Sequence, residues 1–281
     1  MFTQSLDARA STIASLDLAA YLERIEWGDD IRLDLDTLSG LLAAHVSHIP
    51  FENLDILARR PVHLDLDRLQ DKLVRAGRGG YCFEHATLFA AVLMKLGFVP
   101  VRHSAHVTIP APLGESPRTH MFLTVKIPEG TFVVDPGFCA FAPRVPIQLV
   151  HRSLANGTEG ESHWMERKGH LWLLRARLNG TSAEAWVSTL RQESSENFEI
   201  GNYFASTHSG SPFVNRIILR ALTADGRVTL MNRELTISHG NVVHTTQLTD
   251  RRELRALLIE HFGFDLPAVE RLRVPSIPEW Q

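Results

Sequence analysis

The chain has 281 residues, of which 44% are hydrophobic and 22% charged, with a formal net charge of −3 and two cysteines. This is the composition of a globular protein, and a slightly acidic chain lacks the basic face that nucleic-acid binding requires. It contains no polybasic cluster, no apolar run long enough to span a bilayer and too few cysteines for a disulfide framework, so we expect neither a membrane partner nor structural disulfides.

The first sixteen residues carry Asp7 and Arg9 and have no apolar centre, which is not the pattern of a signal peptide. We therefore expect a cytoplasmic protein with reduced thiols, either a monomer or a homodimer, whose partners are small molecules.

The first hundred residues are predicted to be mainly helical. Apolar residues recur at helical spacing in three segments, 18–25, 38–46 and 66–73. Asp36 is the predicted cap of the second helix. A fourth helix is predicted to begin near Cys82 and to stop at Gly97, because glycine is a favoured residue just after a helix.

The middle of the chain is predicted to form strands. Short runs rich in Val, Leu, Phe or Trp, separated by Gly and Pro, occur at 121–127, 131–135, 171–178 and 184–190. They indicate an antiparallel sheet or a small barrel. Two stretches, 111–117 and 155–162, have the composition of loops.

The last part is predicted to mix short strands, such as 227–230, with one clear helix. That helix begins near Asp250, has apolar residues on one face and ends at Gly263. A helical part, a β part and a smaller mixed part give an α+β protein.

Cys82 is the candidate nucleophile. It follows Gly79 and Gly80 in the segment RGGYCFE (78–84), and these glycines free the backbone to turn just before the helix. The unpaired N–H groups at a helix start are expected to lower the pKa of a thiol, and the thiolate is the nucleophilic form. This local pattern fits a buried structural cysteine equally well.

A thiolate nucleophile needs a base, and the base needs a group that orients it. His120 lies in a strand-like run, and Asp135 ends the next predicted strand before a Pro-Gly turn. The order of Cys, His and Asp resembles the papain-like and transglutaminase-like arrangement. The local patterns leave the pairing open, since the chain has 14 histidines and an Asp before a turn is common.

Several separated motifs, in the expected order, resemble those of the arylamine N-acetyltransferase family. They are IPFENL (49–54), RGGYCFE (78–84), THM (119–121), VDPGF (134–138), NYFASTH (202–208) and SPF (211–213). The resemblance covers most of the chain, from residue 18 to residue 240.

The resemblance implies a helical bundle with the nucleophile (1–98), a β-barrel-like domain with His and Asp (99–208) and an α/β lid (209–281). It also implies ping-pong transfer of an acetyl group from acetyl-coenzyme A to arylamines, arylhydrazines or N-hydroxyarylamines, without a metal. In this chain Cys82 would carry the acetyl group as a thioester, His120 would move the proton and Asp135 would orient the imidazole.

The resemblance further suggests the surroundings of the triad. Glu52 and Arg78 would form a buried ion pair beside the site. The predicted substrate-binding residues are Phe51, Phe83, Thr119, Phe138 and Phe213. Aromatic rings suit a flat acceptor, although the same phenylalanines are equally consistent with plain core.

The chain departs from the family pattern at Pro136, at Cys139 and at Ala86. These departures bear on acceptor range and on how coenzyme A is held, because Pro136 lacks a backbone donor and Cys139 adds a second thiol. His103 and His106 are three apart in a strand-like run, which points their rings to opposite faces, so no metal site is expected. The alternative functions are an amide synthase that uses carrier-bound acyl donors, a papain-like thiol hydrolase and a non-catalytic binding module.

Overall fold

The computed structural model describes residues 15–108, 117–139, 142–152, 154–156, 161–178, 180–223, 226–240 and 242–280. The predicted loop at 111–117 lies outside these residues except for Pro117, and so does the N-terminal segment up to residue 14. In the part of the chain that is described, no helix has the length and apolar character needed to cross a membrane.

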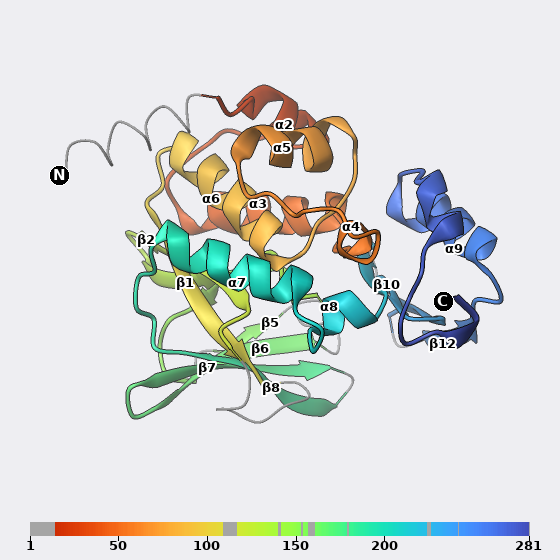
Figure 1. Cartoon of the computed structure of the whole chain (residues 1–281). Helices are drawn as coiled ribbons and strands as arrows, with labels where there is room; N and C mark the ends of the chain where they lie inside the picture. The colour runs from red at the N-terminus through yellow and green to blue at the C-terminus, as the bar shows by residue number, and fades with distance from the viewer. Residues whose placement is uncertain are drawn as a thin grey trace.

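The four predicted helices are present, and together they form the upper layer in Figure 1. This layer contains α2 (Leu18–Arg24), α3 (Leu35–His48), α4 (Leu54–Leu57), α5 (Leu66–Leu69), the π-helical turn η1 (Gln70–Arg75) and α6 (Cys82–Lys95). The predicted cap of α3 was wrong by two residues. Asp34, not Asp36, accepts a hydrogen bond from the backbone N–H of Thr37 at 2.9 Å, because it has the extended backbone that a cap needs.

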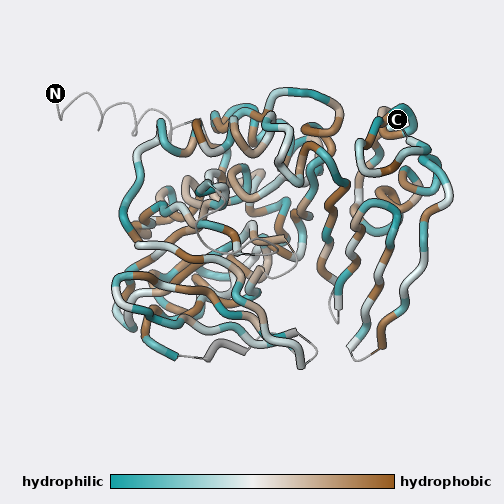
Figure 2. The backbone as a smooth tube through the Cα atoms, turned by 60° about the horizontal axis from the view of Figure 1, so that its bottom comes forward, coloured by the Kyte–Doolittle hydropathy of each residue, from teal (hydrophilic) through white to brown (hydrophobic). Residues whose placement is uncertain are grey.

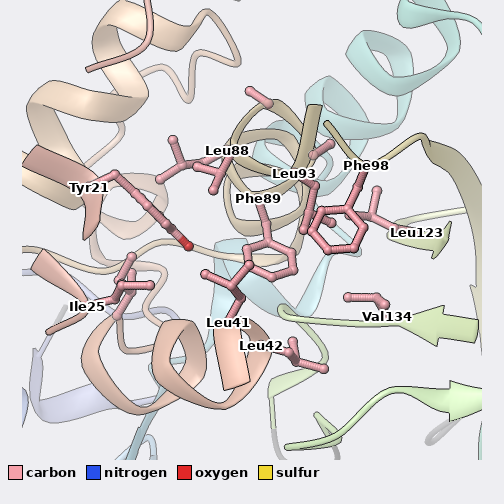
Figure 3. Packing of buried hydrophobic residues seen from close by; sticks show 14 of the residues in the cluster. Tyr21, Ile25, Leu41, Leu42, Leu88, Phe89, Leu93, Phe98, Leu123 and Val134 are labelled. Carbon is pink, nitrogen blue, oxygen red and sulfur yellow. The ribbon is translucent and has the colours of Figure 1, made fainter. Parts of the chain in front are cut away.

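The helices pack on one another and on one face of the sheet. Figure 3 shows Phe89 and Leu93 of α6 directed toward Leu41 of α3 and toward Leu123 and Val134 of the strands beneath. All five side chains are fully buried. Removing a buried aromatic ring of this kind costs about 3–5 kcal/mol of stability, so this contact holds α6 against the sheet.

The predicted barrel is a nearly closed antiparallel sheet. Within the described residues eight strands pair in the order β4-β3-β2-β1-β8-β7-β6-β5, and the two ends of this order, β4 and β5–β6, lie close together. The strands are β1 (Pro100–Val107), β2 (His120–Ile127), β3 (Gly130–Val134), β4 (Ile147–Gln148), β5 (Leu154–Asn156), β6 (Glu161–Lys168), β7 (Leu171–Leu178) and β8 (Thr181–Ser188). The predicted loop at 155–162 was wrong at both ends, since residues 155–156 and 161–162 lie in paired strands. Residues 157–160 are outside the described part.

Two helices connect the barrel to a smaller sheet. They are α7 (Ser195–Thr207) and α8 (Pro212–Asn215), which sequence reasoning did not predict. The smaller antiparallel sheet contains β9 (Ile218–Leu222), β10 (Gly226–Met231), β11 (Glu234–His239) and β12 (Val242–Gln247). In Figure 2 its strands lie beside the main body, and hydrophobic and hydrophilic residues alternate along them.

The predicted last helix is α9 (Arg251–Leu257), which continues as the π-helical turn η3 (Leu258–Phe262). Asp250 caps its start and Gly263, in the left-handed region at φ 77°, ends it, as predicted. Short 3₁₀ turns, η4 (Pro267–Arg271) and η5 (Pro278–Trp280), complete the chain. The α+β class and the barrel-like sheet are thus confirmed, while the three domain bounds stay a prediction.

Candidate active site

The segment before the nucleophile lies tightly against the IPFEN segment. Gly80 donates to the carbonyl of Pro50 at 3.2 Å, and Glu52 donates to the carbonyl of Gly80 at 2.8 Å. A Cβ on Gly79 would stand 2.0 Å from the Pro50 carbonyl oxygen. The two glycines are therefore needed for close approach of two backbones. Neither glycine has a positive φ. The prediction that they are needed for unusual backbone angles at a sharp turn was therefore wrong.

A cluster of five charged side chains, two of them buried and three partly buried, holds the start of α6. We call it the anchoring cluster: Glu52, Asp55, Lys72, Arg78 and Glu84. Glu52 accepts from Arg78 at 2.5 Å, so the predicted pair exists, and Arg78 also donates to Asp55 at 2.9 Å. Lys72 Nζ lies 2.8 Å from Glu84 and 2.9 Å from Asp55. The cluster joins η1, α4 and α6 through charge-assisted hydrogen bonds.

Glu84 links this cluster to the nucleophile's helix. Its Oε2 accepts from the backbone N–H of Tyr81 at 2.9 Å, which satisfies a donor next to the first turn of α6. Burial raises the pKa of the Glu84 carboxyl, while Lys72 opposes the rise. Cys82, one residue beyond Tyr81, is thereby held at the first position of the helix.

The sulfur of Cys82 is buried, with 3% of the residue exposed. It donates to the carbonyl oxygen of Thr119 at 3.6 Å, directly before His120 on β2. Burial raises the pKa of the Cys82 thiol, and the carboxylate of Asp135 adds to the rise; the backbone N–H groups of Met121 and Phe83 oppose it. The expected lowering by the helix start was therefore wrong, because desolvation outweighs the helix end at this depth. A thiolate here needs a cationic neighbour.

His120 and Asp135 form the pair that the sequence suggested. His120 Nε2 donates to Asp135 Oδ2 at 2.8 Å, with 2% of the histidine and none of the aspartate exposed. The ring nitrogen that carries the proton, Nε2, faces the carboxylate. The neutral ring therefore has its free lone pair on Nδ1. The thiol contacts the backbone on both sides of His120, at Thr119 and Met121.

Strand alternation explains why these side chains meet. Successive side chains on β2 point to opposite faces, so His120 shares a face with Phe122, and Asp135 shares one with Val133. Phe122 and Val133 belong to the same buried cluster inside the barrel, together with Trp186 of β8. Trp186 Nε1 donates to Asp135 Oδ2 at 2.9 Å, so one oxygen accepts two hydrogen bonds.

Gly137 allows the Asp135 loop to approach the nucleophile. A Cβ on this residue would stand 2.7 Å from Cα of Cys82 and 3.3 Å from Cβ of His85. Its backbone N–H donates to Asp135 Oδ1 at 3.3 Å. The loop that carries the carboxylate therefore touches the helix that carries the thiol.

The predicted aromatic residues divide between two clusters. Phe51 and Phe83 are buried in the cluster that contains Cys82, and Phe213 packs against it from α8. Phe138 belongs to the barrel cluster instead, although its ring is edge-on to that of His120 at 4.9 Å. Thr119 is half-buried, and its carbonyl, not its side chain, is what contacts the sulfur.

Two of the three departures from the family pattern lie together. Pro136 and Cys139 line a cavity of about 10 Å³ with Phe51, His85 and Arg220. Cys139 is half-buried with φ 32°, a left-handed backbone that glycine adopts more readily. A larger cavity of about 340 Å³ lies between α4, α8 and the C-terminal segment, and no residue of the triad lines it.

Sequence reasoning missed several residues of this region: Asp55, Lys72, Gly137, Trp186 and His85. Gly137 was within a quoted motif, but the others carry no local signal, since each acts through contacts distant in the sequence. His103 and His106 join no potential metal site, because the described residues contain no cluster of three or more His, Cys, Asp or Glu suited to a metal ion.

Comparison with known proteins gives a consistent result. A family profile described as N-acetyltransferase matches residues 34–271. An arylamine N-acetyltransferase of Mycolicibacterium smegmatis is 34% identical over 259 residues, which cover 90% of this chain and 93% of the relative. One from Escherichia coli K12 is 32% identical over 245 residues, covering 86% and 87%.

A solved structure agrees in fold as well. The Mycobacterium marinum arylamine N-acetyltransferase, determined in complex with CoA, superimposes with a TM-score of 0.85 at 32% identity. The superposition covers 90% of this chain and 94% of that one.

Proposed function

The chain belongs to the arylamine N-acetyltransferase family, and from that membership we propose that it moves an acetyl group from acetyl-coenzyme A to an arylamine, arylhydrazine or N-hydroxyarylamine. The observation that carries the proposal is the His120–Asp135 hydrogen bond of 2.8 Å beside the buried thiol of Cys82. The Mycobacterium marinum relative was solved with CoA, which supports coenzyme A as the carrier of the acetyl group here.

In the first step the Cys82 thiol gives its proton to His120 Nδ1, and the sulfur attacks the acetyl carbonyl carbon. The tetrahedral intermediate collapses, the bond to the coenzyme A sulfur breaks, and that sulfur leaves as the free thiol with the proton from His120. The acetyl group then remains on Cys82 as a thioester. Asp135 stabilises the imidazolium that exists during this step.

In the second step the amine attacks the thioester carbonyl carbon. His120 takes a proton from the attacking nitrogen and returns one to the Cys82 sulfur as the carbon–sulfur bond breaks, which releases the amide. The backbone N–H of Phe83, which faces the sulfur, is suited to bind the oxyanion of both tetrahedral intermediates.

Burial of the site affects both the ionisation of the thiol and the fate of the thioester. Because the environment raises the pKa of the isolated thiol, the sulfur is charged mainly when His120 carries the proton beside it. Water is also kept from the thioester, which favours transfer to an amine over hydrolysis. The aromatic side chains of Phe51 and Phe213 supply the apolar wall that an arylamine ring packs against.

Initial-rate kinetics test the proposal. Varying acetyl-coenzyme A at several arylamine concentrations should give parallel double-reciprocal lines, the mark of a ping-pong reaction. Converging lines would contradict the thioester route. Rapid acyl hydrolysis without amine would favour a thiol hydrolase, and turnover only with carrier-bound thioesters would favour an amide synthase. Binding of arylamine without any turnover would favour the non-catalytic alternative.

Three further expectations complete the proposal: a cytoplasmic location, a monomeric or homodimeric state, and the three-domain division at residues 98 and 208. None of them bears on the chemistry above.

A further inference from the structure

Trp186 makes a contact that the reaction scheme has not used. Its indole N–H donates to Asp135 Oδ2 at 2.9 Å, the same oxygen that accepts from His120 Nε2 at 2.8 Å. Neither Trp186 nor Asp135 has any exposed surface, so water does not replace this hydrogen bond. An indole N–H only donates, and therefore its partner oxygen must act as an acceptor.

The indole is held in place by the barrel. It stacks on Phe122 with 4.1 Å between ring centroids and 25° between planes, and it lies 6.4 Å from the His120 ring. Strand β1 separates β8 from β2, and the β1 residue opposite His120 is Ala105, whose small side chain belongs to the same buried cluster. Asp135 directly follows β3, so the tryptophan reaches the carboxylate from three strands away.

We propose that Trp186 is a positioning residue of the triad, which keeps Asp135 Oδ2 directed at His120 Nε2. The inference rests on the proposed acetyl transfer. Asp135 is fully buried, and its neutral donors are the indole and the N–H of Gly137 at 3.3 Å. The buried guanidinium of Arg220 also interacts with the charge of Asp135, but Arg220 donates its hydrogen bonds to the carbonyl oxygens of Cys139 and Ala142. The indole is therefore the group that, with His120 Nε2, fixes the direction of Oδ2, while the Gly137 N–H binds Oδ1.

The consequence for His120 is a single tautomer. An Oδ2 that accepts from the indole and faces the imidazole requires the imidazole proton on Nε2, which leaves Nδ1 free to accept the thiol proton. Without the indole N–H, the carboxylate is free to turn. The fraction of enzyme with the correct tautomer then falls.

The direct test replaces Trp186 with benzothienylalanine, which keeps the bicyclic shape and puts sulfur in place of the N–H. We expect roughly a tenfold loss in the rate of Cys82 acetylation at neutral pH. ¹⁵N NMR of His120 should show the Nδ1–H tautomer appearing beside the Nε2–H form.

Two further variants separate this effect from packing. Trp186→Phe removes both the N–H and part of the ring, so it should show the same mixture of tautomers with an added loss of thermal stability. Trp172→Phe is the matched control, because Trp172 packs against the same cluster from β7, whereas the indole hydrogen bond to Asp135 comes from Trp186; its His120 tautomer should match that of the wild type.

The outcomes distinguish the inference from the function on which it rests. If the wild type forms the acetyl-cysteine and the benzothienyl variant keeps the wild-type tautomer and acetylation rate, the positioning role is wrong. If the wild type forms no acetyl-cysteine at all, the proposed function fails first.

Discussion

Two groups of side chains lie beside the first turn of α6. They differ in whether the acidic group has a cation close to it. In the anchoring cluster each carboxylate has a cation nearby, as where Lys72 Nζ lies 2.8 Å from Glu84 and 2.9 Å from Asp55. In the proposed triad the sulfur of Cys82 is also buried, but its hydrogen bond is a 3.6 Å donation to a carbonyl, and its thiol pKa is raised.

The difference shows that position and reactivity come from different residues. Charges in the anchoring cluster are paired, so they fix where the helix begins without being available for chemistry. In the proposed mechanism the ionisation of the thiol depends instead on His120, which takes up and releases the proton. Each of the following variants changes one of these groups of residues, and the measurement shows whether the others are unaffected.

The largest effect is expected from Cys82→Ser. The hydroxyl is far less nucleophilic than the thiol, so arylamine acetylation should fall roughly 10⁴-fold. Stability should change little, because the side chains are similar in size and the anchoring cluster is intact. Product formation and thermal unfolding measure the two properties separately. Cys139→Ser is the control and should keep wild-type acetylation; loss of activity in the control alone would identify the other sulfur as the nucleophile.

Lys72→Met should act mainly on stability. Removing the cation leaves Glu84 and Asp55 without a partner on that side, in a place where only 14% of the lysine side chain is exposed. We expect a loss of about 3–5 kcal/mol in the free energy of unfolding, measured by urea titration. Lys168→Met breaks a surface pair with Glu184 in which the lysine is 54% exposed, and it should cost less than about 1 kcal/mol. Equal losses in the two variants would mean that the anchoring cluster does not anchor.

A third buried polar group extends the comparison, since it is held without charge. Tyr21, His45 and His85 form a hydrogen-bonded chain that ends at the carbonyl of Pro50. Burial lowers the pKa of His85 from its ordinary 6.5 to about 4, and it lowers that of His45 well below its usual value. The fold therefore needs both rings neutral, while the unfolded chain takes up protons below pH 6.5.

The stability from His85 is accordingly complete above pH 6.5 and is lost as the pH falls toward 4. The shift of His85 corresponds to about 3 kcal/mol. Denaturant titrations at pH 7.5 and pH 4.5 measure it. His85→Gln keeps a donor and an acceptor but does not titrate, so its stability should depend less on pH than that of the wild type. His244→Gln, at an exposed position on β12, should show the same dependence of stability on pH as the wild type. If His85→Gln shows that dependence as well, His85 is not its source.

The smallest of the four effects is expected from Gly137→Ala, which changes the contact between the Asp135 loop and the helix that carries Cys82. The new Cβ would lie 2.7 Å from Cα of Cys82, so the Asp135 loop must move away from the helix. A displacement of this size should lower kcat roughly 10²-fold through loss of alignment. Gly28→Ala, where nothing lies within 4 Å of the new Cβ, is the control and should be silent in the same assay. Full activity of the Gly137 variant would show that alignment tolerates the shift.

Local patterns in the sequence were enough to predict most of the longer helices and several strands, but not α7. The α6 helix (Cys82–Lys95) and the last helix (α9 with η3, 251–262) have periodic apolar faces and a glycine shortly after their ends, so each carries its own signal. The motif order added the family and the proposed triad, because motifs widely spaced along the chain coincide by chance far less often than a single motif does.

The features that could not be predicted from the sequence depend on contacts between residues far apart in the chain. Trp186 reaches Asp135 from three strands away, and Lys72 reaches Glu84 from the preceding turn, so neither has a pattern of its own. The direction of the Cys82 pKa shift was wrong for the same reason. The helix start is visible in the sequence, but the degree of burial that outweighs it is set by the packed structure.

The central claim is that the sulfur of Cys82 carries the acetyl group, and peptide mapping tests it most directly. The protein is incubated with acetyl-coenzyme A without amine, quenched in acid and digested, and the acetylated peptide is located by mass spectrometry. We predict one acetyl group on Cys82, which disappears when an arylamine is added before the quench. An acetyl group on Cys139, or none on either cysteine while acetylated arylamine still forms, would contradict the account.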